Sequence, residues 1–244
     1  MRVVSNRKDS GASGWLFLIV HITCMSNPWA NIPNRSPYIL PSDCEAVCSF
    51  NAASKQEYQI RLEVLPQPYA GNIKTAQVYV LNLNPGFEEK DIYWQNNLKS
   101  FKLANFNSLH GNCKEGFYFL DSRFKQTGAY RWWGQILKQV IKVWGEKRVI
   151  KELMCVEFFP YHSLKYKQME KNIFSQGYSF YLVKQAIKTK KSIIIMRRED
   201  LWLKAVPELA NYPYVVLNKK QRRPWITKNN ILENKFDEIF KLST

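Results

Sequence analysis

Two apolar segments of this chain carry side chains that could do chemistry. The run at residues 78–81 leads to Asn84 and a Pro-Gly turn, and Glu157 lies within a second apolar run. The carbonyl oxygen of an Asn side chain can accept from a water molecule and orient it, and a buried carboxyl group tends to stay protonated and can then donate. Two structural alternatives stay open. Asn84 could cap the turn before the proline, and Glu157 could pair with Arg197 or Arg198.

The elements that must position these side chains alternate along the chain. Four short apolar segments are typical of buried strands, and three amphipathic segments are typical of helices. This alternation predicts an α/β fold, a three-layer αβα sandwich around a central four-stranded, mainly parallel sheet. The expected strands are residues 78–83, 150–159, 192–196 and 214–217, and the expected helices are residues 128–144, 175–189 and 229–242.

Each expected strand ends in a polar or proline-containing segment. These segments read NPG, FPYHS, RRED and NKKQRRPW, in chain order. Ligands of parallel α/β sheets bind beyond the carboxyl ends of the strands. We therefore expect the four segments to meet and form one site.

The rest of the chain divides into three parts by composition. Residues 1–24 contain the short apolar run GWLFLIVHITC and are expected to be an upstream extension outside the fold, with a secretion signal as the minority alternative. Residues 25–76 are expected to be an arm that packs on the domain. Within it, residues 26–50 are rich in Pro, Ser and Asn, and residues 65–76 are expected to form a loop because of their Pro and Gly content. Residues 77–244 form the expected α/β domain, in which residues 96–115 are expected to be irregular.

The charge of the chain indicates a nucleic-acid partner. Its 244 residues hold 36 Lys and Arg against 20 Asp and Glu, a net charge of +16, and the basic residues alternate with aromatic ones. The five cysteines fit reduced thiols of a cytoplasmic protein better than a disulfide framework. We expect a monomer that binds no membrane, metal or cofactor.

Other enzyme classes find less support. A phosphoryl-transfer enzyme would use a glycine-rich phosphate loop, and neither GxxxxGK[ST] nor GxGxxG occurs. A metal-dependent nuclease would use clustered carboxylates, for which Glu88, Glu89 and Asp91 are the available group. A basic module that binds DNA without catalysis remains the non-enzymatic alternative.

The motifs at the strand ends resemble those of the uracil-DNA glycosylase superfamily. LNLNPG at residues 81–86 resembles its first motif in the Asn-Pro-Gly form of the thymine/uracil mismatch branch. CVEFFPYHS at residues 155–163 occupies the place of the second strand. VVLNKKQRRPWIT at residues 215–227 occupies the place of the late motif, although the His-Pro-Ser of that motif is absent. The resemblance covers residues 78–230 and implies a DNA glycosylase, which flips a nucleotide out of the duplex and cleaves its N-glycosidic bond.

The resemblance also implies roles for individual residues. Asn84 would orient the attacking water, and Gly86 would leave space at C5 of the base, where uracil-specific members carry a Tyr. Glu157 replaces an Asn common in uracil-excising members, and it could accept from the amine of cytosine or donate a proton to the leaving base. Phe119, with Tyr118 as the alternative, would stack on the base. The residues expected to contact the base are Gly86, Phe87, Tyr118, Phe119, His162 and Asn218.

A basic loop stands where the family has its minor-groove motif. Its cations would hold phosphates, and Trp225 would enter the space that the flipped base leaves. The residues expected to bind DNA are Arg197, Arg198, Lys219, Lys220, Arg222, Arg223 and Trp225. Space at C5 together with a carboxylate at the amine edge predicts excision of a cytosine with a bulky 5-substituent. The chain is also similar to an anti-phage branch of this superfamily, which implies glucosylated 5-hydroxymethylcytosine of phage DNA as the base and antiviral defence as the role. The alternative is repair of uracil or thymine mismatches.

Overall fold

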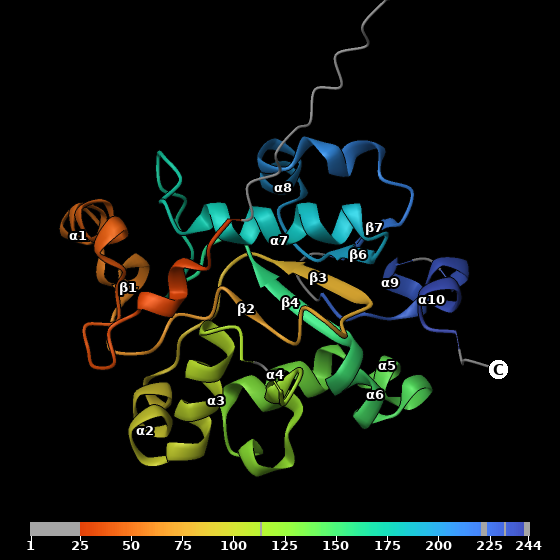
Figure 1. Ribbon diagram of the computed structural model, residues 1–244, viewed down its shortest axis with the longest axis horizontal. Helices are drawn as coiled ribbons and strands as arrows, with labels where there is room; N and C mark the ends of the chain where they lie inside the picture. Colours follow the sequence, from red (N-terminus) through yellow and green to blue (C-terminus); the bar gives the residue numbers. More distant parts are fainter. Residues whose placement is uncertain (1–24, 113, 221–223, 232, 242–244) are drawn as a thin grey trace, which may run out of the picture.

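A five-stranded sheet forms the centre of the computed structural model, which describes residues 25–112, 114–220, 224–231 and 233–241 (Figure 1). The strand order is β2-β4-β3-β6-β7, with β2 antiparallel to β4 and the other neighbours parallel. The protein is thus of mixed α/β class with a mostly parallel sheet. The strands of this sheet are β2 (Tyr69–Ala70), β3 (Val78–Asn82), β4 (Leu153–Glu157), β6 (Ser192–Ile195) and β7 (Val215–Leu217).

Alternate residues of the strands point into two separate hydrophobic cores. In β3, Tyr79 and Leu81 belong to one core and Val78 and Val80 to the other, and all four are buried. A strand covered on both faces reads as a continuous apolar run, which is why the sequence pattern identifies β3 so clearly.

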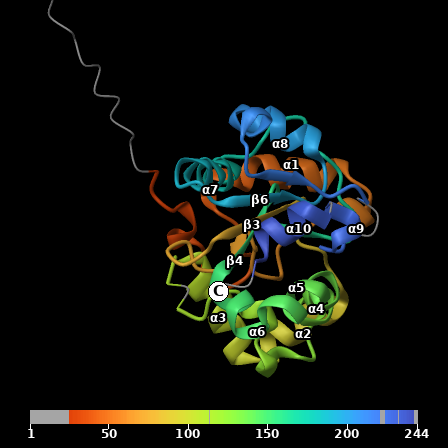
Figure 2. The same cartoon turned by 90° about the vertical axis from the view of Figure 1, so that its right-hand side faces the viewer.

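Helices cover both faces of the sheet. Figure 2 shows α7 and α8 on one side and α3 to α6 on the other, with the sheet between them. Thr127 caps the start of α4, where its side chain accepts from the backbone nitrogen of Tyr130. The helices are α1 (Cys44–Ala53), α2 (Glu89–Asn97), α3 (Lys99–Leu109), α4 (Gly128–Ile136), α5 (Lys138–Trp144), α6 (Glu146–Glu152), α7 (Gln176–Lys188), α8 (Glu199–Ala205), α9 (Lys228–Ile231) and α10 (Glu233–Ile239).

The central sheet departs from the sequence expectation in its number of strands. It has five strands rather than four, because Tyr69 and Ala70 pair with β4 as an edge strand. Two residues are too few to give a periodic signal, and their pairing depends on a strand more than eighty positions away. The expectation of a loop at this point was therefore wrong.

Two helical regions also differ from the expectation. Residues 96–115 are largely helical, in the end of α2 and in α3, rather than irregular. The expected helix 128–144 is divided at Leu137, where the Ile136 carbonyl accepts from the backbone nitrogen of Ile226. The expected C-terminal helix, residues 229–242, is found as α9 and α10 on either side of residue 232, which lies outside the described residues.

The segment before β3 is built into the fold. Its strand β1 (Ile60–Arg61) pairs with β5 (His162–Ser163) in a second, two-stranded sheet. The fully buried carboxylate of Asp43 accepts from the Tyr161 hydroxyl at 2.8 Å and from the Ser175 backbone nitrogen at 3.1 Å. The segment thereby holds the chain on either side of β5.

The structure also bears on membrane association. Within the described ranges, none of the helices has the length and apolar character that crossing a membrane requires.

Candidate active site

A pocket of about 560 Å³ opens at the carboxyl end of the parallel strands. Its walls come from the loop after β3, from β4 and β5, from the starts of α2 and α4, and from the end of β6. The convergence expected from the strand ends is therefore present for three of the four strands. The expected site residues that line the pocket are Asn84, Gly86, Phe87, Phe119, Glu157, His162 and Arg197.

Asn84 is held by hydrogen bonds that use only its amide nitrogen. Nδ2 donates to the Ser163 hydroxyl at 3.0 Å and to the Pro85 carbonyl at 3.0 Å. Its Oδ1 has no hydrogen-bond partner among the described residues. Asn84 is thus fixed by donation and presents an acceptor at a pocket wall, the arrangement that orienting a water molecule requires.

Glu157 is buried at the end of β4, directly opposite Asn82 in the parallel ladder. Its Oε1 accepts from Asn82 Nδ2 at 3.1 Å and from the Cys155 thiol at 3.4 Å, whereas Oε2 is buried without a partner. Burial raises the pKa of Glu157 to about 7, although these two hydrogen bonds and the nearby Arg197 favour the carboxylate. Near neutral pH this group can therefore either donate or accept a proton.

His162 contacts the backbone of the Pro-Gly turn. Its Nδ1 lies 2.6 Å from the Gly86 carbonyl, and Gly86 also bridges to Ser163. Burial lowers the pKa of His162 to about 4, so the ring is neutral near pH 7. A Cβ atom placed on Gly86 would have no atom within 4 Å, so the space beside this residue is open.

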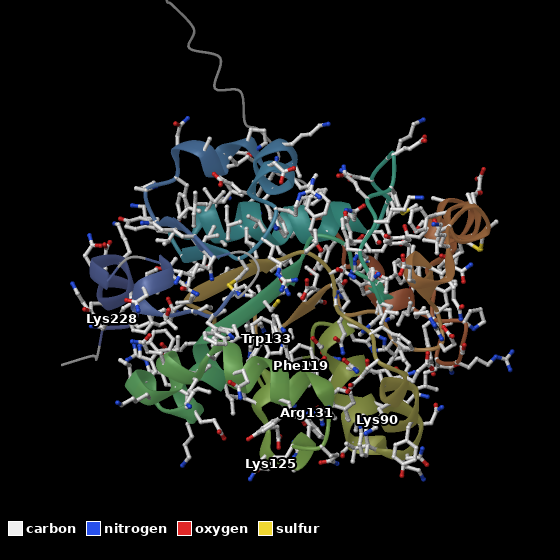
Figure 3. The ribbon with its side chains drawn as sticks, turned by 180° about the vertical axis from the view of Figure 1, so that it is seen from behind. Lys90, Phe119, Lys125, Arg131, Trp133 and Lys228 are labelled. Atoms are coloured by element: carbon white, nitrogen blue, oxygen red, sulfur yellow. The ribbon has the colours of Figure 1, made fainter. Side chains whose placement is uncertain are left out.

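Aromatic rings form one wall of the pocket. Phe119 and Trp133 lie nearly parallel, with ring centroids 6.3 Å apart and 8° between the planes (Figure 3). Trp132 also lines the pocket, and its ring meets Trp133 edge to face. Phe87 lines the pocket too, and the guanidinium of Arg61 lies 4.3 Å from the centre of its ring. Flat apolar walls of this kind suit a planar ring as ligand.

Several expected site residues lie elsewhere. Tyr118 is buried beside the aromatic wall and bonds to Asn105, so it does not line this pocket. Asn218 is buried too, and its amide donates to the Trp225 carbonyl at 3.2 Å. Arg198 bonds to Asp200 at 2.7 Å outside the pocket. Also outside the pocket are Lys219, Lys220 and Trp225, which are exposed.

Two predicted DNA contacts, Arg222 and Arg223, lie outside the described residues. The ion pair that the sequence allowed between Glu157 and Arg197 or Arg198 does not form. In the described part of the chain, no ion pair within 4.0 Å joins Glu157 to either arginine. Arg197 acts on Glu157 only as a nearby charge.

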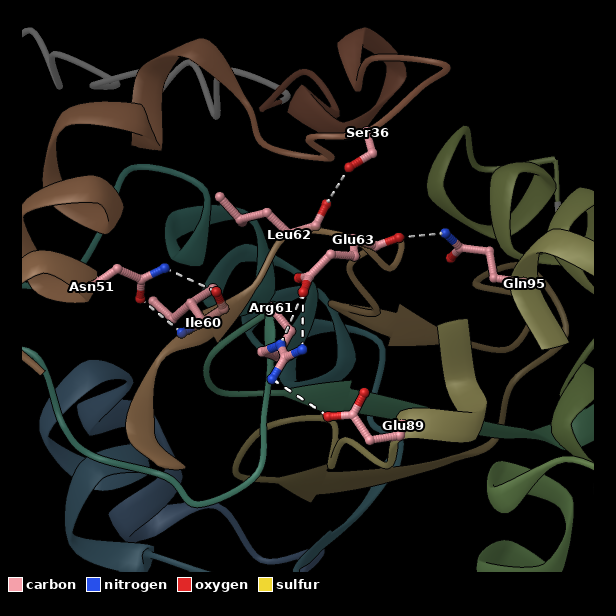
Figure 4. A network of polar contacts seen from close by, with 8 residues as sticks. All are labelled: Ser36, Asn51, Ile60, Arg61, Leu62, Glu63, Glu89 and Gln95. Atoms are coloured by element: carbon pink, nitrogen blue, oxygen red, sulfur yellow. Dashed lines mark hydrogen bonds and ion pairs between the residues drawn. The ribbon is translucent and has the colours of Figure 1, made fainter. Parts of the chain in front are cut away.

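Sequence reasoning missed residues that hold the site from a distance. Figure 4 shows Arg61 of β1 between Glu63 and Glu89, the first residue of α2, with a closest oxygen at 2.9 Å and 3.7 Å respectively. Through Glu89 and the Phe87 ring, Arg61 fixes the chain that follows the Pro-Gly turn. Asn82 and Ser163 were also missed, although Asn82 stands two positions before Asn84, a spacing that would place both on one face of an extended strand and that the sequence does contain.

Acidic residues at the pocket edge cap helix α2. Asp91 Oδ2 accepts from the Glu88 backbone nitrogen at 2.8 Å, which caps α2, and burial raises the pKa of Asp91 to about 6. Within the described ranges, no three His, Cys, Asp or Glu side chains come close enough together to hold a metal ion.

The site thus offers an oriented acceptor, a carboxyl group that titrates near neutrality, open space beside a glycine and flat aromatic walls. Comparison of this chain with protein-family models, with curated proteins and with solved structures finds no match. The class that fold and pocket define is an α/β protein with a pocket at the carboxyl edge of its mostly parallel sheet.

Proposed function

We propose that this protein is a monofunctional DNA glycosylase, which flips a modified pyrimidine into the pocket and excises it. The observation that carries the proposal is that Asn84 and Glu157 both line this pocket, at the ends of neighbouring strands. One presents a free acceptor for water, and the other presents a buried carboxyl group with a pKa near 7. Hydrolysis of an N-glycosidic bond needs both a placed water molecule and a group that manages the charge of the leaving base.

The shape of the pocket supports a base as the ligand. Its volume of about 560 Å³ lies within the range of roughly 300–1,000 Å³ that is typical of small-molecule sites. The wall of Phe119 and Trp132 offers stacking surface, and the space beside Gly86 admits a substituent. A carboxyl group at the edge suits the exocyclic amine of cytosine. We therefore propose glucosylated 5-hydroxymethylcytosine as the base.

The charge of the chain supports DNA as the partner. With a net charge of +16, a duplex would bind through its phosphates. Figure 3 shows Lys90, Lys125 and Arg131 along one edge of the molecule, on the side of Phe119 and Trp133. Such an enzyme would act as a monomer in the cytoplasm, on phage DNA whose modified cytosines distinguish it from host DNA.

The test is base release from labelled duplexes that differ in one base. We expect an alkali-labile site to form at glucosylated 5-hydroxymethylcytosine and not at unmodified cytosine. Direct strand breaks without alkali would indicate a nuclease, and faster release of uracil or mismatched thymine would indicate a repair enzyme. Binding without either product would replace the proposal by a non-catalytic DNA-binding module.

A further inference from the structure

Arg197 is the least satisfied cation of the pocket. It follows β6 closely, lines the pocket wall and is half-buried. Its Nε is buried without a partner, and none of the described residues forms a hydrogen bond or an ion pair with its guanidinium. A half-buried arginine without a partner is costly, and this indicates a ligand that completes its hydrogen bonds.

The adjacent arginine shows the contrast. Arg198 bonds through its guanidinium to both oxygens of Asp200, at 2.7 and 2.8 Å, and to the Gln168 side chain at 3.3 Å. The two adjacent arginines thus differ in their hydrogen bonds. Arg198 has partners and lies outside the pocket, whereas Arg197 lines the pocket and lacks them.

No described carboxylate neutralises Arg197 within ion-pair distance. The nearest acidic influence on it is Glu157, whose own burial favours the neutral form up to about pH 7. A positive charge therefore remains in a partly desolvated wall, where its field is weakly screened. Such a fixed cation acts most strongly on negative charge that develops during a reaction.

We propose that Arg197 is a catalytic residue that stabilises the negative charge of the departing base. This inference rests on the proposed function. As the bond from the sugar C1′ to the base N1 breaks, its electron pair moves into the ring and onto the O2 oxygen. Arg197 donates to that oxygen while the water held by Asn84 adds to C1′. The sugar gains the hydroxyl of this water, and the released base gains the remaining proton.

Asn218, which the sequence predicts to contact the base, already uses its side-chain polar atoms within the protein. Its amide nitrogen contacts the Trp225 carbonyl and the Met196 sulfur, and its Oδ1 accepts from the Lys220 backbone nitrogen. Arg197 stands one strand nearer to β3 in the sheet order, at the pocket itself. The guanidinium has the free donors that the amide lacks.

The test uses the variants Arg197→Met, Arg197→Lys and Arg198→Met of the full chain. The probe is a labelled duplex with one glucosylated 5-hydroxymethylcytosine. In single turnovers at saturating protein, we expect Arg197→Met to release the base about 100-fold or more slowly, with the Kd for the duplex within about twofold. Arg197→Lys should recover part of the rate. Arg198→Met should lower the rate far less than Arg197→Met does, because Asp200 already engages the Arg198 guanidinium.

A second substrate separates charge stabilisation from positioning. A 5-formyl substituent withdraws electrons and makes the base a better leaving group, so the loss in Arg197→Met should be smaller on 5-formylcytosine. An unchanged saturating rate in Arg197→Met, with a raised Kd and a lower salt slope, would overturn the inference and make Arg197 a phosphate-binding residue. An equal loss on both bases would also overturn it.

Thermal unfolding gives a readout that needs no activity. Because Arg197 has no partner to lose, Arg197→Met should leave the Tm unchanged or raise it, and a clear drop in Tm would contradict the unsatisfied state on which the inference depends. If the wild type releases no base from either duplex, the proposed function fails. If the wild type is active and Arg197→Met is equally fast, only the present inference fails.

Discussion

Two regions differ in whether their buried polar groups have hydrogen-bond partners. One is the pocket at the ends of β3, β4 and β6, and the other is the basic segment after β7. In the pocket, polar atoms of Asn82, Glu157 and Arg197 are buried without partners. In the later segment, Asn218 uses both ends of its amide, and the Lys219 backbone nitrogen donates to the Asn230 carbonyl at 2.9 Å. Unsatisfied buried groups are expected where a ligand completes them, whereas satisfied ones serve the fold. On this contrast we expect the proposed chemistry at the pocket, and a structural or DNA-binding role for the later segment.

Replacing an asparagine in each region tests this assignment most strongly. Asn84→Ala removes the water acceptor, and we expect base release to fall roughly 100-fold or more while duplex binding stays. Asn218→Ala removes buried hydrogen bonds, and we expect it to cost about 1–3 kcal/mol of folding free energy. Single-turnover assays and denaturant unfolding measure the two effects.

The opposite pattern would reverse the comparison. If Asn84→Ala kept its rate but lost stability, Asn84 would be only a cap of the Pro-Gly turn. If Asn218→Ala lost activity while keeping its stability, the late motif would belong to the reaction after all.

The pH dependence of Glu157 provides the next test. Its pKa is about 7 in the folded protein and near 4.5 when solvated, so the folded state retains the proton more strongly. The favourable contribution of this group is complete below pH 4.5 and is lost as pH rises through 7. Glu157→Gln should therefore be more stable than wild type at pH 8, by roughly 3 kcal/mol at most, and similar to it at pH 4.5.

Activity should follow the same titration. If the protonated carboxyl group donates to the leaving base, wild-type base release declines as pH rises through about 7, and Glu157→Gln is slower with a flat profile. A pH profile that is unchanged in the variant would leave Glu157 with a purely structural role beside Asn82.

The sequence predicts the part of the fold that rests on long apolar runs. The strands β3, β4, β6 and β7 are all found from such runs, and their parallel order brings Asn84 and Glu157 to one edge. The two-residue strand β2 and the largely polar helix α2 lack a periodic signal. Their formation depends on partners elsewhere in the chain, which a single sequence does not reveal.

The same limit applies inside the site. Asn84, Glu157 and His162 were found because each lies within an apolar run or directly follows one. The hydrogen bond between Asn82 and Glu157 spans 75 positions, and the contact of Arg61 with Phe87 joins the two-stranded sheet to the loop that follows β3. The difference between Arg197 and Arg198 is equally invisible in sequence, because it depends on which guanidinium finds a carboxylate.

Two exposed apolar side chains allow a smaller test of the comparison. Leu164 is 60% exposed at the pocket edge, and Trp225 is 45% exposed in the later segment. Because an apolar side chain next to the pocket can fill the space left by a flipped base, we expect Leu164→Ala to slow release from duplex roughly tenfold. Release from single-stranded DNA should hardly change.

Trp225→Ala serves as the matched variant. If it slows release from duplex more than Leu164→Ala does, the later segment supplies the wedge, as the sequence first suggested. Equal losses on single and double strands in Leu164→Ala would mean that this side chain only shapes the pocket.

The smallest expected effect concerns the charges of the later segment. Lys219 and Lys220 are exposed and lie outside the pocket, so they can hold phosphates without touching the base. Changing both to Glu, alone or together with Arg222 and Arg223, should weaken binding to every duplex alike. The slope of log K against log salt should fall by about one for each phosphate that is no longer bound, and the single-turnover rate at saturation should stay. Binding titrations at several salt concentrations measure the slope, with modified and unmodified duplexes as a pair.

An unchanged slope would place the DNA surface on another face, with the edge of Lys90, Lys125 and Arg131 as the next to test. A change in the preference between the two duplexes would instead bring the later segment into base recognition, and the division between the two regions would then fail.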